Sequence, residues 1–279
     1  MSAPASTIAD PGATGSSPPA ELFPPVQPWL LIDIAKVPGG TGELRLRRRG
    51  DEFSIGLGNI ELMNSRLSGS EEALATAALD RLGRHRGLRI LIGGLGMGFT
   101  LRASLVRLHS DARVTVAELV PAVIAWAKGP LAGLFGDSLS DPRVAIHEGD
   151  VGDHMRASRG VYDMILMDVD NGPEGFTREA NDELYGMPGL GVARAALRDG
   201  GILAVWSMGP DDAFARRLGR SGFAVEEIRV RAHKGRSGSR HVIWFATKQD
   251  GRPAGPPGGR ERRPSGRSVG SIARPRPPR

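Results

Sequence analysis

The chain has 279 residues and contains no cysteine. This absence excludes disulfide bonds, thiolate metal ligands and a cysteine nucleophile, and it fits a reducing cytosol. The first residues lack the basic start and apolar core of a secretory signal, and no apolar run is long enough to cross a bilayer. We therefore expect a soluble, cytoplasmic protein without a membrane partner.

Excess positive charge is almost absent from the body of the chain, although the whole sequence carries a formal net charge of +6. Residues 251–279 alone hold eight Arg and one Glu. A body close to neutral argues against a nucleic-acid-binding domain. The Pro-, Gly- and Arg-rich tail cannot form a core, so we expect it to contact nucleic acid only weakly, by charge. A solvated tail with no specific partner is the simpler interpretation.

Composition and hydrophobic pattern divide the chain into four predicted regions. Residues 1–27 predict a disordered leader, and residues 249–279 predict the disordered basic tail. Residues 28–86 predict a small antiparallel β unit followed by a helix with Ser70 as its N-cap. Residues 87–248 alternate apolar strands with helical segments and end in an antiparallel hairpin. The predicted fold class is α/β, with a Rossmann-like, doubly wound, mostly parallel sheet.

The most informative motif is a strand, a glycine turn and a helix in direct succession, LRILIGGLGMGFTLRA at Leu88–Ala103. Gly94, Gly96 and Gly98 allow the backbone to turn sharply and to approach a ligand closely. The helix that follows offers free N–H groups at its N-terminus. The motif therefore predicts a nucleotide- or nucleoside-binding site, to which we assign these three glycines.

Acidic residues follow the next two predicted strands. Glu118, at the end of one, is suited to accept hydrogen bonds from both ribose hydroxyls, and Asp150, after the next, to hold an adenine amino group. Their neighbours Leu119 and Val151 complete the predicted nucleoside-binding set. The alternative for Glu118 is a structural acid that caps the helix beginning near Pro121.

Asp168 closes the apolar strand MILMD, and Asp170 follows it within a Gly- and Pro-containing loop. Two nearby carboxylates bind cations and raise one another's pKa, which suits a general base acting on an ammonium. We assign both as candidate catalytic residues; the alternative is a turn in which they cap local N–H groups. The segment His147–His154 holds His and acidic side chains on a strand end and a turn, so we expect no metal site there.

Taken together, these motifs resemble the spermidine synthase family and, more broadly, the class I S-adenosylmethionine-dependent methyltransferase fold. The similarity runs from about Leu44 to Lys248 and includes GGLGMGFTLRA, VTVAELVPAVIAWAK, DPRVAIHEGD and YDMILMDVDNGP. It implies decarboxylated S-adenosylmethionine as a co-substrate, no permanently bound cofactor, and an amine acceptor deprotonated by Asp168. It also makes the N-terminal β unit a possible homodimer contact.

The chain departs from the family pattern at three places. The N-terminal Gln and Tyr that help bind polyamine in the family have no clear counterparts in the segment ELMNSRLSGSEE. Met97 stands where the family usually carries an aspartate that holds the donor's amine, and Asp170 lies one place earlier than the family's second acid. Two alternatives to aminopropyl transfer therefore stay open. One is methyl transfer from S-adenosylmethionine to an amine or another small acceptor, and the other is a catalytically silent binding or scaffolding protein on the same fold.

Overall fold

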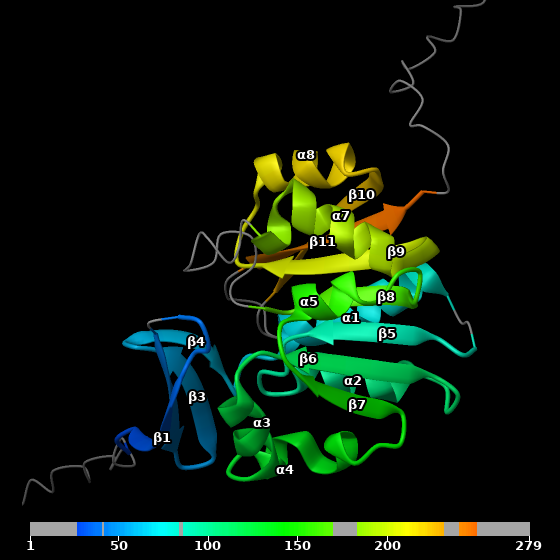
Figure 1. Cartoon of the computed structure of the whole chain (residues 1–279). Coiled ribbons are helices and arrows are strands. Elements are labelled where there is room, and N and C mark those ends of the chain that lie inside the picture. Colours follow the sequence, from blue (N-terminus) through cyan, green and yellow to red (C-terminus); the bar gives the residue numbers. More distant parts are fainter. Residues whose placement is uncertain (1–26, 41, 84–85, 170–182, 232–239, 250–279) are drawn as a thin grey trace, which may run out of the picture. The chain divides into compact units, whose positions relative to one another are not determined.

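The computed structural model describes residues 27–40, 42–83, 86–169, 183–231 and 240–249 (Figure 1). The chain forms two compact units, Met1–Arg66 and Leu67–Arg279. The predicted leader, the basic tail and Asp170 with the loop after it fall outside the described residues, apart from single residues at the edges. No helix in the described ranges is long and apolar enough to span a bilayer.

The N-terminal unit is a four-stranded antiparallel sheet in the order β1-β2-β3-β4, as the sequence predicts. Its strands are β1 (Leu30–Lys36), β2 (Glu43–Arg49), β3 (Glu52–Leu57) and β4 (Ile60–Asn64). Alternating residues of β2 and neighbouring residues of β3 are buried, because one face of the sheet carries Leu44, Leu46, Phe53 and Ile55. Strand β1 lies at the edge and keeps most of its apolar side chains exposed.

The larger unit contains a seven-stranded sheet in the order β10-β11-β9-β8-β5-β6-β7. The strands are β5 (Arg89–Gly93), β6 (Arg113–Glu118), β7 (Val144–Glu148), β8 (Tyr162–Met167), β9 (Leu197–Ser207), β10 (Phe223–Arg231) and β11 (Arg240–Lys248). The first five are mutually parallel, and β11 pairs antiparallel with both β9 and β10. This confirms the predicted α/β class with a mostly parallel sheet and a closing antiparallel hairpin.

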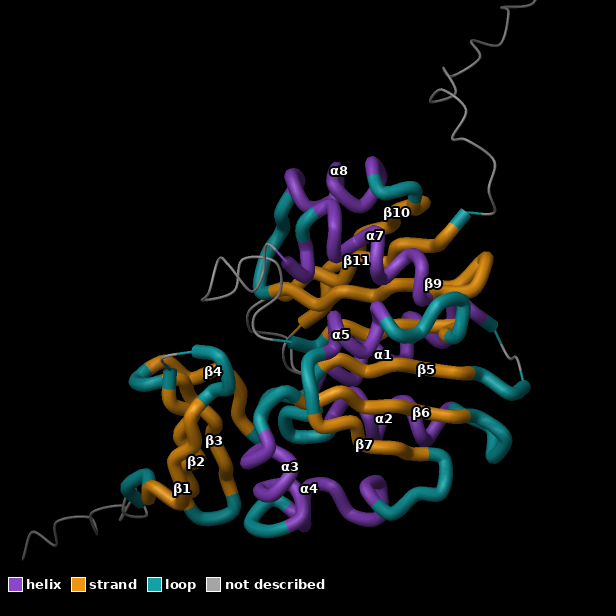
Figure 2. The backbone as a smooth tube through the Cα atoms, in the orientation of Figure 1, coloured by secondary structure: helices purple, strands orange, loops and turns teal. Residues whose placement is uncertain are grey.

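Helices lie on both faces of this sheet (Figures 1 and 2). They are α1 (Gly69–Leu82), α2 (Phe99–Arg107), α3 (Pro121–Lys128), α4 (Ala132–Phe135), α5 (Val151–Arg156), α7 (Met187–Ala196) and α8 (Asp212–Arg220), with a 3₁₀ turn η1 (Gly136–Leu139). Helix α1 packs on α2 and on strands β8 to β11, whereas α5 packs on α7. This layered arrangement leaves the carboxyl ends of the parallel strands free to form a site.

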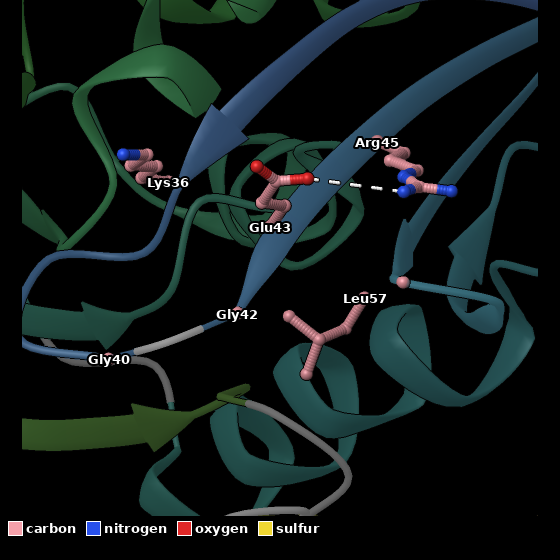
Figure 3. A pocket seen from close by; sticks show the side chains of 7 residues that line it. Lys36, Gly40, Gly42, Glu43, Arg45 and Leu57 are labelled. Carbon is pink, nitrogen blue, oxygen red and sulfur yellow. Dashed lines mark ion pairs between the residues drawn. The ribbon is translucent and has the colours of Figure 1, made fainter.

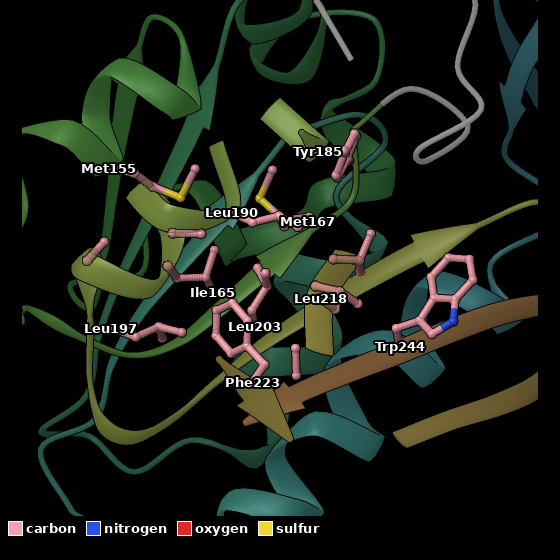
Figure 4. Packing of buried hydrophobic residues seen from close by; sticks show 14 of the residues in the cluster. Met155, Ile165, Met167, Tyr185, Leu190, Leu197, Leu203, Leu218, Phe223 and Trp244 are labelled. Atoms are coloured by element: carbon pink, nitrogen blue, oxygen red, sulfur yellow. The ribbon is translucent and has the colours of Figure 1, made fainter. Parts of the chain in front are cut away.

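A hydrophobic core fills the space between the sheet and helices α5, α7 and α8 (Figure 4). Its aromatic centre is Phe214, which meets Tyr185 and Trp244 edge to face with ring centroids 5.7 and 5.0 Å apart. Both Phe214 and Trp244 are fully buried. Such pairs add about 0.5–1.5 kcal/mol beyond the area they bury, so this core fixes the hairpin against the parallel strands.

Helix α1 differs from the sequence-based expectation in two respects. It begins at Gly69 with Ser68 at the N-cap position, so the prediction of Ser70 as the N-cap is wrong. Ser70 instead lies in the first turn, buried, with its hydroxyl bonded to other side chains. In addition, the division between the compact units falls after Arg66, so α1 groups with the large sheet, whereas the sequence grouped it with the β unit.

Candidate active site

The glycine turn after β5 is hydrogen-bonded to the carboxyl ends of β6 and β8. The Gly94 N–H donates to the Ala117 carbonyl at the end of β6 (2.8 Å), and the Asp168 N–H donates to the Gly93 carbonyl (3.0 Å). Gly94 has a φ of +89°, and a Cβ atom there would lie 2.5 Å from the Asp168 carbonyl oxygen. Only glycine meets both demands, so Gly94 sets the position of the Asp168 backbone.

Gly98 is the N-cap of α2 and also has a left-handed backbone, with a φ of +76°. A Cβ atom at this position would lie 2.4 Å from the buried ring of Phe135 on α4. Gly96, between them, has a φ of +48°. The predicted glycines therefore adopt the conformations for which glycine is required, and the N-terminus of α2 opens at the strand ends.

Glu118, at the end of β6, is buried, with 7% of its surface exposed. Its Oε2 accepts a hydrogen bond from the Leu95 N–H of the glycine turn (2.8 Å), and its Oε1 accepts one from the Val120 N–H (2.9 Å). Val120 is the N-cap position of α3. These bonds join the glycine turn to the residue that precedes α3, whose N-terminus receives no side-chain cap, and ribose binding by Glu118 stays a prediction.

Asp150 is the N-cap of α5, and its Oδ1 accepts a hydrogen bond from the Asp153 N–H (2.9 Å). The carboxylate is exposed, while Val151, the first residue of the helix, is buried. Leu119 is 39% exposed beside Glu118. The two segments are joined because the Gly149 N–H donates to the Glu118 carbonyl (2.8 Å). The predicted nucleoside-binding residues thus lie along neighbouring strand ends.

Asp168 follows β8 directly, and among the described residues its carboxylate bonds to a side chain of another element. Its Oδ2 accepts a hydrogen bond from the Thr100 hydroxyl in the first turn of α2 (2.6 Å). Thr100 is buried and its hydroxyl also lies 3.3 Å from the Glu71 carbonyl oxygen of α1. The backbone of α1, the Thr100 side chain of α2 and the Asp168 side chain after β8 therefore meet at the carboxyl end of the sheet.

Burial raises the pKa of Asp168 to about 7, with the negative charge of Glu71 as the second cause. The hydrogen bond from Thr100 acts in the opposite direction and lowers it. Burial also raises the pKa of Glu71, an effect that the hydrogen bond from Ser70 reduces. A carboxyl group with a pKa near neutrality exchanges protons readily at physiological pH, as a general base requires.

A chain of hydrogen bonds continues from Glu71 to the hairpin. The Ser70 hydroxyl donates to Glu71 Oε2 (2.7 Å), and His241 Nδ1, in β11, lies 3.0 Å from the same hydroxyl. The His241 ring meets Trp206 of β9 edge to face, with centroids 4.8 Å apart. Burial lowers the pKa of His241, so its imidazole is neutral around pH 7.

Three residues of this cluster, Thr100, Glu71 and His241, were not identified from the sequence. Thr100 could have been found from its position, because it lies two residues after Gly98, in the first turn of the helix that follows the glycine motif. The sequence indicated only a helix start at this point, with Ser70 as its N-cap. His241 carries no local signal, because only the pairing of β11 with β9 brings it to the site.

Other sequence-based candidates take no part in the described cluster. Met97, at the position of the family aspartate, is 2% exposed. His154 bonds through Nε2 to the Tyr162 hydroxyl (2.6 Å) and its ring lies 4.5 Å from that of His147. Among the described residues, no group of three or more His, Asp or Glu side chains is placed to hold a metal ion.

A separate recess of about 590 Å³ lies wholly within the N-terminal unit (Figure 3). It is lined by Lys36, Gly40, Gly42, Glu43, Arg45, Leu57 and Gly58. Glu43 and Arg45 form a 3.9 Å ion pair at its wall and both remain partly exposed. None of the predicted site residues contributes to it.

Comparison with known families gives a match to the spermine/spermidine synthase domain over residues 71–209. This range contains the glycine turn, Glu118, Asp150 and Asp168, together with Glu71 and Thr100. Residues 71–209 belong to a spermidine synthase-like family, and the chain has a methyltransferase-like fold.

Two curated relatives agree with this assignment. A polyamine aminopropyltransferase of Korarchaeum cryptofilum is 31% identical over 121 residues, which is 43% of this chain and 36% of the relative. Polyamine aminopropyltransferase 1 of Streptomyces coelicolor is 29% identical over 149 residues, which is 50% of this chain and 27% of the relative. The chain thus matches about a third of the length of these relatives.

Solved structures support the fold. A spermidine synthase in complex with the transition state analogue AdoDATO superposes with a TM-score of 0.62 and 18% identity. The spermidine synthase of Thermotoga maritima gives a TM-score of 0.61 and 19% identity. Each comparison covers 78% of this chain and 72% of the solved one.

Proposed function

We propose that the chain is a transferase that moves an aminopropyl group from decarboxylated S-adenosylmethionine to an amine, with Asp168 as the general base. The observation that carries the proposal is the environment of Asp168. Its carboxyl group has a pKa raised to about 7 and bonds to Thr100, and its backbone lies at the end of β8 against the glycine turn of a spermidine synthase-like domain. The two curated relatives bear the name of this activity.

The reaction is a direct displacement. The amine nitrogen attacks the donor carbon attached to the sulfonium sulfur, a nitrogen–carbon bond forms, and the carbon–sulfur bond breaks. The electron pair goes to sulfur, and methylthioadenosine leaves as a neutral thioether. The proton on the attacking nitrogen passes to the Asp168 carboxylate, which later releases it to water. Alignment of the three reacting atoms supplies much of the rate acceleration in such a step.

The donor would lie along the carboxyl ends of β5, β6 and β7. In this arrangement Gly94, Gly96 and Gly98 leave room for the nucleoside, Glu118 accepts from the ribose hydroxyls, and Asp150 receives the adenine amino group. Leu119 and Val151 supply apolar contacts to the base. Asp170 remains a proposed partner of Asp168 in binding the ammonium of the acceptor.

Two measurements test the proposal. Calorimetric titration with S-adenosylmethionine, its decarboxylated form and methylthioadenosine measures the donor preference. Incubation of the preferred donor with a panel of mono- and diamines, followed by mass spectrometry, identifies the group that is added. We expect tighter binding of the decarboxylated donor and addition of an aminopropyl group, with Asp168→Asn retaining donor binding and losing transfer.

Other outcomes would change the assignment. Preference for intact S-adenosylmethionine and addition of a methyl group would make the chain a methyltransferase, which the replacement of the family aspartate by Met97 favours. Binding of none of the three nucleosides would favour a scaffold without catalysis. Full transfer activity in Asp168→Asn would leave the aminopropyl assignment intact but remove the general base.

A further inference from the structure

The hydrogen bonds around Glu71 have a defined direction. A serine hydroxyl has one hydrogen, and Ser70 donates it to the Glu71 carboxylate (2.7 Å). The contact with His241 Nδ1 (3.0 Å) must then use a Ser70 lone pair, so Nδ1 carries the hydrogen. The neutral His241 is thereby held in the Nδ1–H form, and the chain runs from His241 through Ser70 to Glu71.

The same helix turn brings Glu71 to Asp168. The Thr100 hydroxyl lies between the Glu71 backbone carbonyl and the Asp168 carboxylate, and the charge of Glu71 acts on Asp168. Ser70 is 1% exposed and Thr100 is 2% exposed, so water screens this contact poorly. Among the described residues, no Arg, Lys or His side chain forms an ion pair with the carboxylate of Glu71 or of Asp168.

We propose that Glu71 is a positioning residue for Asp168, and that His241 and Ser70 hold its carboxylate in place as a hydrogen-bonded relay. The two carboxyl groups then titrate as a pair, because removal of a proton from one hinders ionisation of the other. The part of this inference that concerns catalysis rests on the proposed function of Asp168.

The consequence is a site that keeps a proton near neutral pH until a cation arrives. When a cationic group binds beside the pair, its positive charge favours the ionised form of both carboxyl groups, and one proton leaves to solvent. Within the part of the chain that the structure describes, the titratable groups that act on this cluster or bond to it include Glu71 and Glu72 of α1 and His241 of β11, and α2 contributes the neutral Thr100. Of these, Glu71 is the charged group that acts directly on Asp168.

Carbon-13 NMR of protein labelled at the Asp and Glu carboxyl carbons tests the relay without any substrate. Assigned with Asp168→Asn, the Asp168 signal should titrate near pH 7 in the wild type. Glu71→Gln removes one negative charge, so the Asp168 midpoint should fall by about one pH unit, a tenfold change in proton affinity. Ser70→Ala should give part of the same shift, because it releases the Glu71 side chain.

Nitrogen-15 NMR gives a second signature, assigned with His241→Asn. We expect the Nδ1–H form of His241 in the wild type and in Glu71→Gln, whose amide oxygen still accepts from Ser70. Ser70→Ala should return the ring to the Nε2–H form that water favours. The Nε2–H form in the wild type would overturn the relay, because His241 Nδ1 could then not donate a hydrogen bond to Ser70.

Glu72→Gln is the matched control, with the same charge change one residue along the helix. It should shift the Asp168 midpoint clearly less than Glu71→Gln, and equal shifts in both variants would overturn a specific role for Glu71. Circular dichroism and thermal melting establish that each variant is folded. These readings need no donor or acceptor, so they stand apart from a failure to find transfer activity. If transfer is found, the acid limb of the kcat/KM profile should move with the NMR midpoint.

Discussion

The carboxyl ends of β6 and β8 both carry an acid after an apolar strand, yet the two acids are in opposite surroundings. Glu118 accepts two backbone N–H bonds, one from the glycine turn and one from the start of α3. Asp168 accepts a hydroxyl from Thr100 and faces the charge of a second acid, Glu71. Backbone N–H groups stabilise a carboxylate, whereas burial beside another carboxylate disfavours it.

These different surroundings suit the two acids to different tasks at the same edge of the sheet: Glu118 to ligand binding and Asp168 to proton transfer. An acid whose oxygens accept fixed backbone N–H groups is a stable acceptor, suited to orient neutral hydroxyls. An acid whose pKa lies near 7 is suited to take a proton and return it. Acid-to-amide substitutions at these two positions should therefore have different effects on turnover, and effects of opposite sign on stability near neutral pH.

The largest expected effect is on turnover in Asp168→Asn. An asparagine cannot accept the proton from the attacking amine, so kcat should fall about 10²- to 10⁴-fold, the usual contribution of a general base. Glu118→Gln should act mainly on the Kd of the nucleoside. Steady-state kinetics and calorimetry on both variants measure this contrast; an equal loss of kcat in both would remove the division of roles.

The second effect is structural and concerns the glycine turn that joins the carboxyl ends of β6 and β8. Gly94→Ala adds a Cβ at a φ of +89°, 2.5 Å from the Asp168 carbonyl oxygen. We expect about 3 kcal/mol or more of lost unfolding free energy, from the left-handed backbone and the clash together. Gly160→Ala is the control, with a φ of +61° and no atom near the new Cβ. It should cost about 1–2 kcal/mol in denaturant titrations.

Equal losses in the two glycine variants would mean that the contact between Gly94 and Asp168 contributes nothing beyond the backbone conformation. In that case the turn would not fix the position of the Asp168 main chain. Measurement of the nucleoside Kd in Gly94→Ala at a temperature where the variant is folded separates a local effect on the site from a global one.

Much of this sheet edge could be predicted from the sequence, because parallel strands bring their carboxyl ends together wherever their order is known. The glycine turn, Glu118, Asp150 and Asp168 each follow an apolar strand. The environment of each acid could not be predicted. That Glu118 accepts from Leu95 depends on how the turn folds over β6, which no local pattern specifies.

The Glu71 neighbourhood was missed for a different reason. Helix α1 precedes the first strand of the large sheet, and its placement is decided by packing on α2 and β9. The acids in its first turn have the ordinary pattern of a helix start, and the serine beside them resembles an N-cap. Only the fold shows that Ser70 bonds to His241, more than a hundred residues away in the chain.

A third effect distinguishes the two acids by stability. In Glu118→Gln, the amide oxygen can accept from Leu95 or Val120, and the amide nitrogen must face the other N–H group. An unsatisfied buried donor costs about 1–3 kcal/mol, so the variant should lose roughly 2 kcal/mol of unfolding free energy. Glu148→Gln, exposed on the adjacent strand end, should stay within about 0.5 kcal/mol of the wild type. Urea titrations at pH 8 make the comparison.

The smallest effect is the pH dependence of stability in Asp168→Asn. The pKa of Asp168 is raised from 3.8 to about 7 by folding, so between these values the folded state holds a proton that the unfolded state has lost. This contribution to wild-type stability is fully present below pH 3.8 and is lost as pH rises toward 7. Because burial is the main cause of this shift, the loss should be on the order of 1 kcal/mol or more across this range. Asparagine does not titrate, so the variant should gain that amount of unfolding free energy relative to the wild type between pH 4 and pH 8.

Urea titrations of both proteins across this range measure the difference in stability. A difference that stays constant with pH would show that Asp168 has an ordinary pKa, and that the contrast with Glu118 is one of geometry alone.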